Sequence, residues 1–220
     1  MMALPTIAPY PLPTTDDLPK NRAPWTVDVD RAVLLVHDMQ RYFLRPYTEG
    51  TQPVAGAISN IAALRTACHA NGVPVVYTAK PGDMSPTQRG LERDFWGGGM
   101  QAITEHTDIT PQLAPKSQDV LLTKWRYSAF SQTDLAERMA AQGRDQLLVT
   151  GVYAHIGCQL TAADAFMRDI QPFMVGDALA DFSADHHHSA LLYTAGRCAA
   201  VLCTDQALDA LHNVPARPGA

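Results

Sequence analysis

The chain has 220 residues, of which 46% are hydrophobic and 18% are charged, and its formal net charge is -5. This length and composition predict one globular domain, and the acidic balance without a basic stripe argues against a nucleic-acid groove. No apolar run approaches the roughly 20 residues of a membrane span, and the first residues lack the layout of a signal peptide, so we expect a cytoplasmic protein.

Residues 1–24 hold six of the sixteen prolines, which rules out a regular helix there and predicts an extended arm. The apolar residues Leu4, Ile7, Tyr10 and Leu12 predict that this arm packs along the surface of the domain. We therefore expect an arm over residues 1–30, a single domain over residues 31–212 and a C-terminal tail over residues 213–220.

From Ala32 onward, apolar strands alternate with helical patterns. Short apolar runs predict strands over residues 32–36, 73–78, 120–123, 173–176 and 199–203 and a strand that begins at Leu147. Helical spacing predicts helices over residues 54–70, 159–168 and 185–196 and from Thr204, and Ser131-Gln132-Thr133-Asp134 resembles a capping box that opens another helix, closed by Gly143. The alternation predicts an α/β fold, a Rossmann-like three-layer αβα domain with a six-stranded, mostly parallel sheet.

A long irregular segment, residues 79–118, interrupts this alternation and is called the flap below. It contains Gly97-Gly98-Gly99 and several prolines. So long a loop in a compact domain is usually functional or disordered. The bulky residues Phe95, Trp96 and Met100 favour an ordered flap.

Polar residues stand at the ends of three predicted strands. Asp38 follows the first strand, Lys124 follows the third, and Gly151 lies at the end of the strand from Leu147. The carboxyl ends of parallel strands share one edge of a sheet, which is where ligands bind in open α/β folds. We therefore expect these three positions at one rim.

Each of these residues has two interpretations. Burial at the edge of the core would raise the pKa of Asp38 and allow proton donation, but a surface aspartate capping a loop is slightly favoured by position alone. Lys124 could hold a neighbouring carboxylate or bind a substrate carboxylate, and a solvated strand-end lysine is an equal alternative. Lys80, Arg89 and Arg126 could line a pocket for anions, although each alone is typical of a solvated side chain.

The remaining candidates favour structural roles. Cys158 could be activated near a helix start, but its apolar setting favours burial. Cys68, Cys158, Cys198 and Cys203 form no Cys-x-x-Cys pair and predict reduced thiols. His186-His187-His188 cannot converge on one metal ion from adjacent helical positions, which favours exposed histidines at a helix start. Tyr153 and His155 flank the Gly151 loop and either contact a ligand or pack.

Five motifs together resemble the isochorismatase family. They cover nearly the whole chain, from the Pro-rich arm to Ala178–Ser183, and those around Lys124 and Gly151 are long. The motifs are His37-Asp38-Met39-Gln40, Tyr77-Thr78-Ala79, Asp94-Phe95-Trp96-Gly97, Lys124-Trp125-Arg126-Tyr127-Ser128-Ala129-Phe130 and Gly151-Val152-Tyr153-Ala154-His155-Ile156-Gly157.

The resemblance also identifies one departure from the wider superfamily of cysteine hydrolases. That superfamily uses an Asp, a Lys and a Cys six residues after the glycine of this loop, and here the sixth residue is Gly157. Cys158 comes one residue late, and a one-residue shift at a helix start rotates a side chain by about 100°. Amide hydrolysis needs the thiol, whereas cleavage of a vinyl ether needs only a proton and a water.

The resemblance therefore implies a hydrolase domain that cleaves enolpyruvyl ethers. It implies that Asp38 donates the proton, that Lys124 orients it, and that Gly157 occupies the catalytic position of the missing thiol. It also implies a cis peptide bond just before Tyr153 and a homodimer, with no cofactor, no metal and a chorismate-derived small molecule as substrate. The residues expected at the substrate are Lys80, Arg89, Phe43, Trp96, Tyr153 and Ala154.

The substrate has two candidates. We favour 2-amino-2-deoxyisochorismate of phenazine-type pathways, because the arm and Gln40–Pro46 resemble those enzymes and because no carrier-protein domain is expected after Ala220. Gly157-Cys158 and residues 165–169 resemble the siderophore-type isochorismatases instead. Lys80 replaces a glutamine usual in both, and an extra cation would disfavour an ammonium substituent. A Cys158-dependent amidase and a non-catalytic binding protein are the alternatives.

Overall fold

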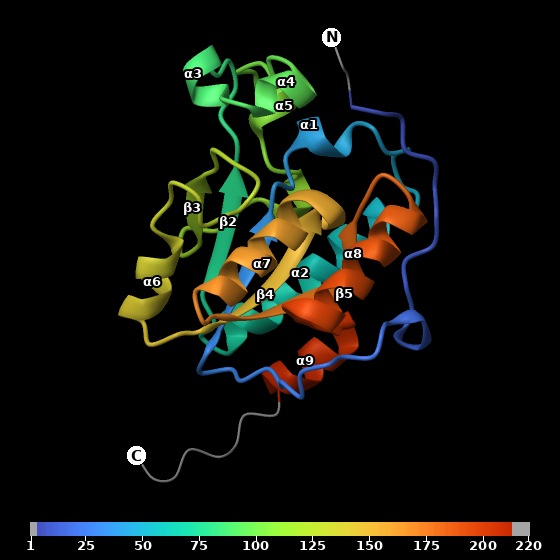
Figure 1. The fold of residues 1–220 in the computed structure, drawn as a ribbon, viewed down its shortest axis with the longest axis vertical. Coiled ribbons are helices and arrows are strands. Elements are labelled where there is room, and N and C mark those ends of the chain that lie inside the picture. The colour runs from blue at the N-terminus through green and yellow to red at the C-terminus, as the bar shows by residue number, and fades with distance from the viewer. Residues whose placement is uncertain (1–3, 213–220) are drawn as a thin grey trace.

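The computed structural model describes residues 4–212, and a six-stranded sheet forms its centre (Figure 1). The spatial order is β3-β2-β1-β4-β5-β6, and every pair of neighbours is parallel. The predicted three-layer α/β fold is confirmed. The strands are β1 (Ala32–His37), β2 (Val75–Ala79), β3 (Val120–Thr123), β4 (Gln146–Val152), β5 (Gln171–Ala180) and β6 (Ala200–Leu202).

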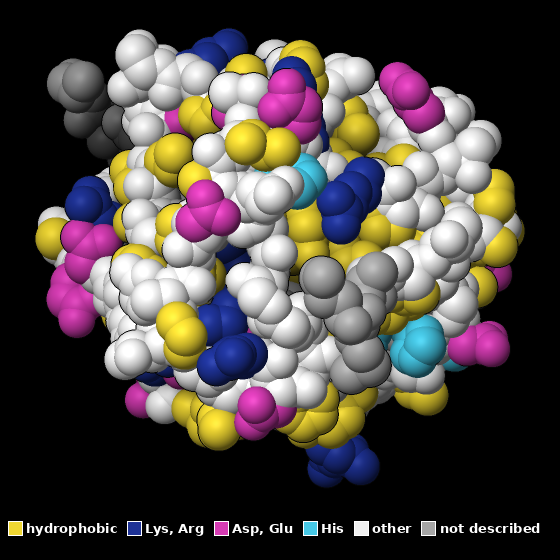
Figure 2. Space-filling model, turned by 90° about the horizontal axis from the view of Figure 1, so that it is seen from above, with side chains coloured by type: hydrophobic (Ala, Val, Ile, Leu, Met, Phe, Trp, Pro, Cys, Tyr) yellow, Lys and Arg dark blue, Asp and Glu magenta, His cyan; other side chains and the backbone are white. Residues whose placement is uncertain are grey.

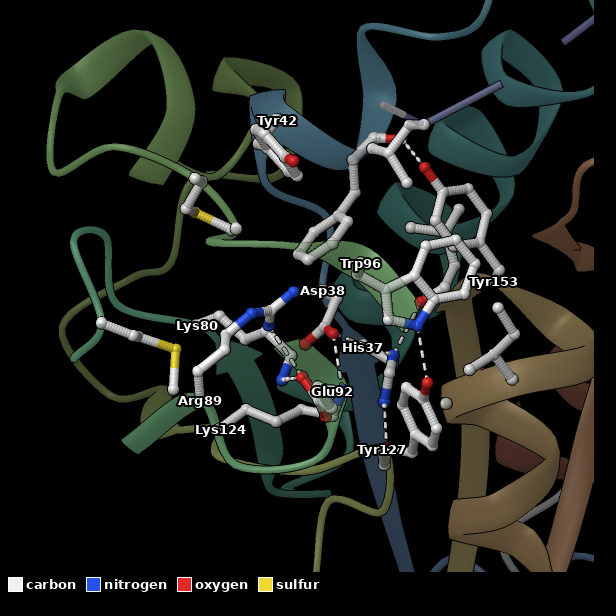
Figure 3. A pocket seen from close by; sticks show the side chains of 18 of the residues that line it. His37, Asp38, Tyr42, Lys80, Arg89, Glu92, Trp96, Lys124, Tyr127 and Tyr153 are labelled. Atoms are coloured by element: carbon white, nitrogen blue, oxygen red, sulfur yellow. Dashed lines mark hydrogen bonds and ion pairs between the residues drawn. The ribbon is translucent and has the colours of Figure 1, made fainter. Parts of the chain in front are cut away.

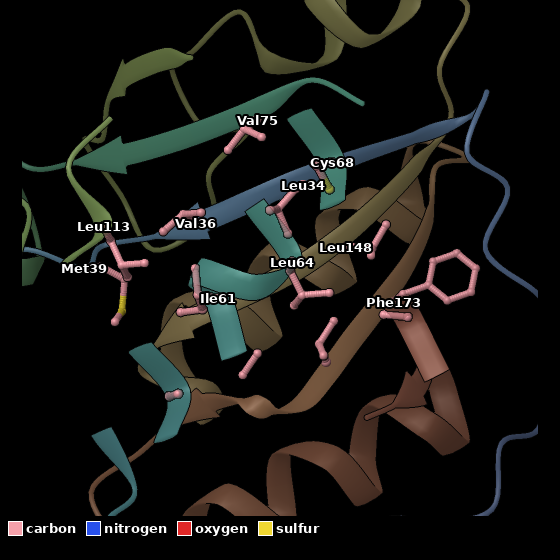
Figure 4. Packing of buried hydrophobic residues seen from close by; sticks show 14 of the residues in the cluster. Leu34, Val36, Met39, Ile61, Leu64, Cys68, Val75, Leu113, Leu148 and Phe173 are labelled. Carbon is pink, nitrogen blue, oxygen red and sulfur yellow. The ribbon is translucent and has the colours of Figure 1, made fainter. Parts of the chain in front are cut away.

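Helices cover both faces of the sheet because its central strands are apolar on both sides. All six residues of β1 are buried, with Leu34 and Val36 in one core and Val33 and Leu35 in the other. The first core lies under α2 (Val54–Ala70) and α9 (Thr204–His212), as Figure 4 shows for α2. The second lies under α6 (Leu135–Ala141), α7 (Gln159–Met167) and α8 (Ala184–Arg197).

Gly151 permits the central strands to approach each other near the rim. Its φ is +107°, and a Cβ atom there would overlap the His37 carbonyl oxygen. The pairing of β4 with β5 also shifts register between Val149 and Gly151. Only glycine fits this position, so the end of β4 lies directly against the end of β1.

The capping-box prediction is wrong. Asp134 is the N-cap of α6 and makes no side-chain cap; it pairs with Arg138 at 2.8 Å instead. The Thr133 hydroxyl accepts a 3.4 Å hydrogen bond from the Leu135 amide. Ser131 lies four residues before Leu135, where the helix begins, and is therefore too far from it to be its N-cap.

The flap is ordered, as predicted, and contains the short helices α3 (Pro86–Arg89), α4 (Glu92–Trp96) and α5 (Thr104–Thr107) and a 3₁₀ turn at Pro111–Leu113. Met100 is buried and packs the flap against the domain, but Phe95 is exposed and does not anchor the flap. The buried Gln40 side chain, just before α1 (Arg41–Leu44), donates hydrogen bonds of 2.9 Å to the carbonyl oxygens of Lys80 and Thr107. Gln40 thus connects two distant parts of the flap, at Lys80 and at Thr107, to the end of β1.

The Pro-rich arm runs along the outside of the domain, with one 3₁₀ turn at Thr15–Asp17 (Figure 1). Ile7 and Tyr10 are buried, and the Tyr10 hydroxyl accepts a 2.7 Å hydrogen bond from the Asp181 amide. The arm therefore packs on the domain as its apolar residues predict. The expected tail, residues 213–220, lies outside the described residues, and no helix in the described range has the length and apolarity to cross a membrane.

Candidate active site

A cavity opens at the carboxyl ends of the central strands. Figure 2 shows this face, on which hydrophobic side chains lie beside Lys and Arg, and Figure 3 shows the cavity from close by. Asp38 comes from the end of β1, Lys80 from the end of β2 and Lys124 from the end of β3. The residues that line it are Leu4, His37, Asp38, Tyr42, Phe43, Lys80, Pro81, Met84, Arg89, Glu92, Trp96, Gly99, Met100, Lys124, Tyr127, Val152, Tyr153, Ile156, Gly157 and Phe182.

Asp38 is buried and held on both carboxylate oxygens. Lys124 Nζ donates to Oδ2 at 2.6 Å, and the Thr78 hydroxyl donates to Oδ1 at 2.7 Å. The Asp38 amide in turn donates to the Thr78 hydroxyl at 3.1 Å, and the backbone of Asp38 adopts a φ of 51°. β2 lies between β1 and β3, so Lys124 reaches Asp38 across the end of the middle strand.

The pKa of Asp38 differs from the sequence-based prediction. Burial acts to raise it, but the electrostatic interactions with His37 and with the positively charged Lys124 and Lys80 outweigh burial and hold the pKa below the usual value. The predicted pKa considered burial alone, whereas the Lys124 Nζ atom lies 2.6 Å from the Asp38 carboxylate. Asp38 is therefore ionised at neutral pH in the free protein.

His37 fills the space beside Gly157. Its Nδ1 lies 2.7 Å from the Val152 carbonyl oxygen, so this nitrogen carries the proton and donates it. Burial lowers the pKa of His37 to about 4, which keeps the ring neutral. A Cβ atom on Gly157 would overlap the Cε1 atom of this ring. Position 157, where the resemblance expects the thiol of a cysteine hydrolase, therefore has no room for a side chain while His37 stays in place.

Two cations and one carboxylate from the flap form another wall of the cavity. The Glu92 Oε2 atom accepts a 2.7 Å hydrogen bond from Lys80 Nζ and a 2.8 Å hydrogen bond from Arg89 Nη1. Arg89 Nε also donates to the Gly97 carbonyl oxygen at 3.1 Å. Burial and the neighbouring Lys124 lower the pKa of Lys80 to about 8, although Glu92 opposes this effect. The cations expected at the substrate are thus partly neutralised by the protein itself.

Aromatic side chains close the cavity. The Tyr153 hydroxyl donates to the Phe43 carbonyl oxygen at 2.6 Å, and Trp96 Nε1 donates to the Tyr127 hydroxyl at 2.6 Å. The Tyr153 and Phe182 ring centroids are 4.4 Å apart. The Val152–Tyr153 peptide bond is cis, as the resemblance implied.

Several candidates lie outside the cavity lining. Ala154 and Cys158 are fully buried in the core under α7, and burial raises the pKa of the Cys158 thiol. Arg126 donates to the Gln88 carbonyl oxygen at 2.8 Å and so links the loop after β3 to the flap. His155 pairs with Asp181 at 2.6 Å.

The prediction that the three consecutive histidines are exposed is wrong for His187. It is buried, and its Nε2 lies 2.9 Å from the Gly176 carbonyl oxygen because the inner face of α8 packs on β5 at this position. His186 and His188 are exposed. Within residues 4–212, no group of three or more His, Cys, Asp or Glu side chains could hold a metal ion.

Several lining residues were not singled out from the sequence, and four of these make contacts described above. His37 and Tyr127 stand inside quoted motifs, next to Asp38 and within the Lys124 motif, and this adjacency was the available signal. Phe182 follows β5, and the only sequence signal for its role was that it lies in the Ala178–Ser183 stretch of the family resemblance. Glu92 had none, because its partners are set by how the flap folds. Together the site offers a buried carboxylate beside a lysine, cations for an anionic substrate and an aromatic cover, a combination suited to proton transfer away from bulk water once the carboxylate is protonated.

The comparisons with known proteins agree with this geometry. The isochorismatase domain model matches residues 32–206. The isochorismatase of Bacillus subtilis is 53% identical over 98% of this chain and 69% of its own length, and phenazine biosynthesis protein PhzD1 of Pseudomonas aeruginosa is 54% identical over 95% of this chain and all of its own. Enterobactin synthase component B of Escherichia coli is 47% identical over 95% of this chain and 73% of its own.

A solved structure shows the same fold. The cysteine hydrolase of Pseudomonas syringae pv. phaseolicola superposes with a TM-score of 0.76 at 24% identity, covering 88% of this chain and 97% of the other. The family model spans most of the chain and the relatives exceed 45% identity over nearly all of it. The chain therefore belongs to the isochorismatase family of hydrolases.

Proposed function

We propose that the protein hydrolyses the vinyl ether of 2-amino-2-deoxyisochorismate and of isochorismate, with a preference for the amino compound. The products are pyruvate and trans-2,3-dihydro-3-hydroxyanthranilate or 2,3-dihydro-2,3-dihydroxybenzoate. The similarity to PhzD1, to enterobactin synthase component B and to an isochorismatase supports this class of reaction. Residues 31–212 form the hydrolase domain and residues 1–30 its arm.

In the proposed mechanism, Asp38 enters protonated and donates its proton to the terminal methylene carbon of the enolpyruvyl group. The double-bond electrons form the new C–H bond and leave an oxocarbenium ion, to which water adds. The proton released by the added water returns to Asp38, and the hemiketal then collapses to pyruvate as the bond between its carbon and the oxygen attached to the ring breaks and its hydroxyl proton passes to that oxygen. Lys124 positions Asp38, and Lys80 and Arg89 bind a carboxylate or a ring hydroxyl.

The arrangement at Asp38 is the observation that carries the proposal. A buried carboxyl held by Lys124 at 2.6 Å and by Thr78 at 2.7 Å is a positioned acid, not a solvated loop cap. Gly157, packed against the His37 ring, leaves the cavity without the thiol that amide hydrolysis requires. Phe43, Trp96 and Tyr153 shield the cationic intermediate from bulk water.

Pyruvate release tests the proposal. The purified protein is incubated separately with isochorismate and 2-amino-2-deoxyisochorismate, and pyruvate is followed by coupling to lactate dehydrogenase. Both compounds should be turned over, with the larger kcat/KM for the amino compound. Absence of pyruvate from both would refute the proposed function, and a hundredfold preference for isochorismate would refute the substrate preference.

Replacing Cys158 with alanine should leave pyruvate release within about twofold of the starting protein, because the thiol is buried in the core and does not line the cavity. The measurement is kcat/KM for isochorismate, with the melting temperature as a control for the lost sulfur atom. A large fall in kcat/KM at unchanged melting temperature would favour a cysteine-dependent amidase instead.

Substrate binding should be accompanied by proton uptake at pH 6. Positive charges hold the pKa of Asp38 low in the free protein, and the carboxylates of a bound substrate offset these charges and raise that pKa. The complex therefore binds more protons than the free protein, and affinity falls as pH rises. Lys80, with a pKa of about 8, is already charged at pH 6 and does not contribute.

Calorimetry in two buffers of different ionisation enthalpy measures this uptake. The probe is a lactyl-ether analogue of isochorismate, which carries both carboxylates but no double bond to protonate. The Asp38→Asn variant, which has no titrating carboxyl at this position, should bind the probe without uptake. Equal heats in both buffers for the unaltered protein would contradict the assignment of Asp38 as the acid.

We also propose that the protein is a cytoplasmic homodimer. The four free, buried cysteines suit a reducing compartment. The family resemblance implies the dimer, and α7 and α8 expose Phe166, Met167, Leu192 and Tyr193, which a second copy could cover. Sedimentation equilibrium gives the mass of the particle, and a monomer at micromolar concentration would refute the dimer.

A further inference from the structure

Glu92 is a second buried acid that lines the cavity, besides Asp38, and it lies beside two cations. Only 6% of its surface is exposed, and one of its oxygens, Oε2, accepts hydrogen bonds from both Lys80 and Arg89. Its other oxygen, Oε1, is buried and has no hydrogen-bond partner among the described residues. A carboxylate oxygen in this state has an unused capacity to accept, and leaving it unused is costly.

The surrounding charges come from four separate elements. Lys80 follows β2, Arg89 ends α3, Lys124 follows β3 and Asp38 follows β1, while Glu92 begins α4. Lys124 is paired with Asp38 at 2.6 Å, so Glu92 is the carboxylate that offsets Lys80 and Arg89. Without it, two cations would face the substrate with no negative partner of their own.

Lys80 by itself disfavours an ammonium substituent on the substrate ring. In the structure this repulsion is offset, because Nζ of Lys80 lies 2.7 Å from the Glu92 carboxylate, which also lines the cavity. A substrate ammonium that approaches this wall meets a negative charge as well as a positive one. A ring hydroxyl at the same place could donate to the carboxylate but gains less from its charge.

We propose that Glu92 determines substrate specificity: it holds Lys80 and Arg89 in place and supplies the negative charge that lets the cavity accept an amino substituent in preference to a hydroxyl. This inference rests on the proposed vinyl-ether hydrolysis and adds the residue that selects between its two substrates. Glu92 donates no proton and forms no bond in the reaction. Its effect is on which ring the site binds.

The test is the ratio of kcat/KM for 2-amino-2-deoxyisochorismate to that for isochorismate in Glu92→Gln. We expect this ratio to fall by about tenfold or more, because glutamine keeps the shape of the side chain but loses its charge. A ratio measured on one preparation is insensitive to partial unfolding, which lowers both constants together. Glu105→Gln, an exposed acid elsewhere in the flap, is the matched control and should leave the ratio unchanged.

The pH profile provides a readout that a structural role would not move. Glu92 raises the pKa of Lys80 from the low value that burial and Lys124 impose. In Glu92→Gln the alkaline limb of kcat/KM for isochorismate should therefore move to lower pH, and in the double variant Lys80→Gln/Glu92→Gln this limb should disappear.

The outcomes separate the two proposals. If the unaltered protein releases pyruvate but Glu92→Gln changes the ratio by less than twofold, the specificity role is refuted and the function stands. An unchanged alkaline limb in Glu92→Gln would refute the coupling to Lys80. If the unaltered protein releases no pyruvate from either compound, the proposed function itself fails.

Discussion

Replacing Asp38 with asparagine should lower kcat for pyruvate release by about 10²- to 10⁴-fold, the range expected when a general acid is removed. Asparagine has nearly the same shape and keeps one oxygen to accept from Lys124, which is 2.6 Å from the Asp38 carboxylate, while its NH2 group would face the Thr78 hydroxyl, which can accept as well as donate. Asparagine cannot donate a proton to carbon. The loss should therefore appear in kcat and not in binding.

Two measurements separate chemistry from binding in this variant. Steady-state kinetics with the pyruvate assay gives kcat, and calorimetry with the lactyl-ether analogue gives the dissociation constant, which should stay within about fivefold because the cationic wall is unchanged. Asp119→Asn is a suitable control, since Asp119 pairs with His69 away from the cavity. Near-normal turnover by Asp38→Asn would remove Asp38 from the mechanism.

Introducing cysteine at position 157 should abolish most activity and should not create an amidase. A Cβ atom there would overlap the His37 ring and lie 3.2 Å from the Tyr127 carbonyl oxygen, so the ring must leave its place between the ends of β1 and β4. Asp38 is the next residue, and a displacement of about 1 Å at a catalytic group costs on the order of 10²-fold in rate. Overpacking also lowers stability, by about 1–3 kcal/mol.

The measurements on Gly157→Cys are kcat/KM for isochorismate, the free energy of unfolding in urea and ammonia release from nicotinamide. Gly196→Ala is the control, because Gly196 lies on α8 with open space around its Cα and a helical alanine is slightly stabilising. Normal pyruvate release by Gly157→Cys would show that His37 has no part in placing Asp38. Measurable ammonia release would show that this pocket can host a working thiol.

The regular elements could be predicted where their signals are local. The helix over Val54–Ala70 has the predicted bounds because its apolar spacing is ended by Asn71-Gly72, and Val120–Thr123 is an uninterrupted apolar run. β5 is longer than predicted, Gln171–Ala180, because Asp177 breaks the apolar pattern. Its carboxylate accepts hydrogen bonds from the Thr204 amide and hydroxyl, so a polar residue is satisfied inside the strand.

The site could be predicted only in part, because its decisive contacts join distant parts of the chain. Strand ends indicated Asp38 and Lys124, but the direction of the Asp38 pKa depends on how closely Lys124 approaches across β2. The pairing of Lys80 with Glu92 depends on short helices in a flap that has no hydrophobic period to reveal them. The burial of His187 likewise follows from tertiary packing of α8.

The N-terminal arm contributes directly to the cavity, because Leu4 lines it. Ile7 and Tyr10 of the same arm are buried against the domain. An affinity tag or fusion partner joined close to Leu4 would therefore stand beside the cavity. Kinetic work on this enzyme is therefore best done with the tag at the carboxyl-terminal end of the chain. The last helix, α9, lies at the end of the molecule away from the cavity-forming edge of the sheet (Figure 1).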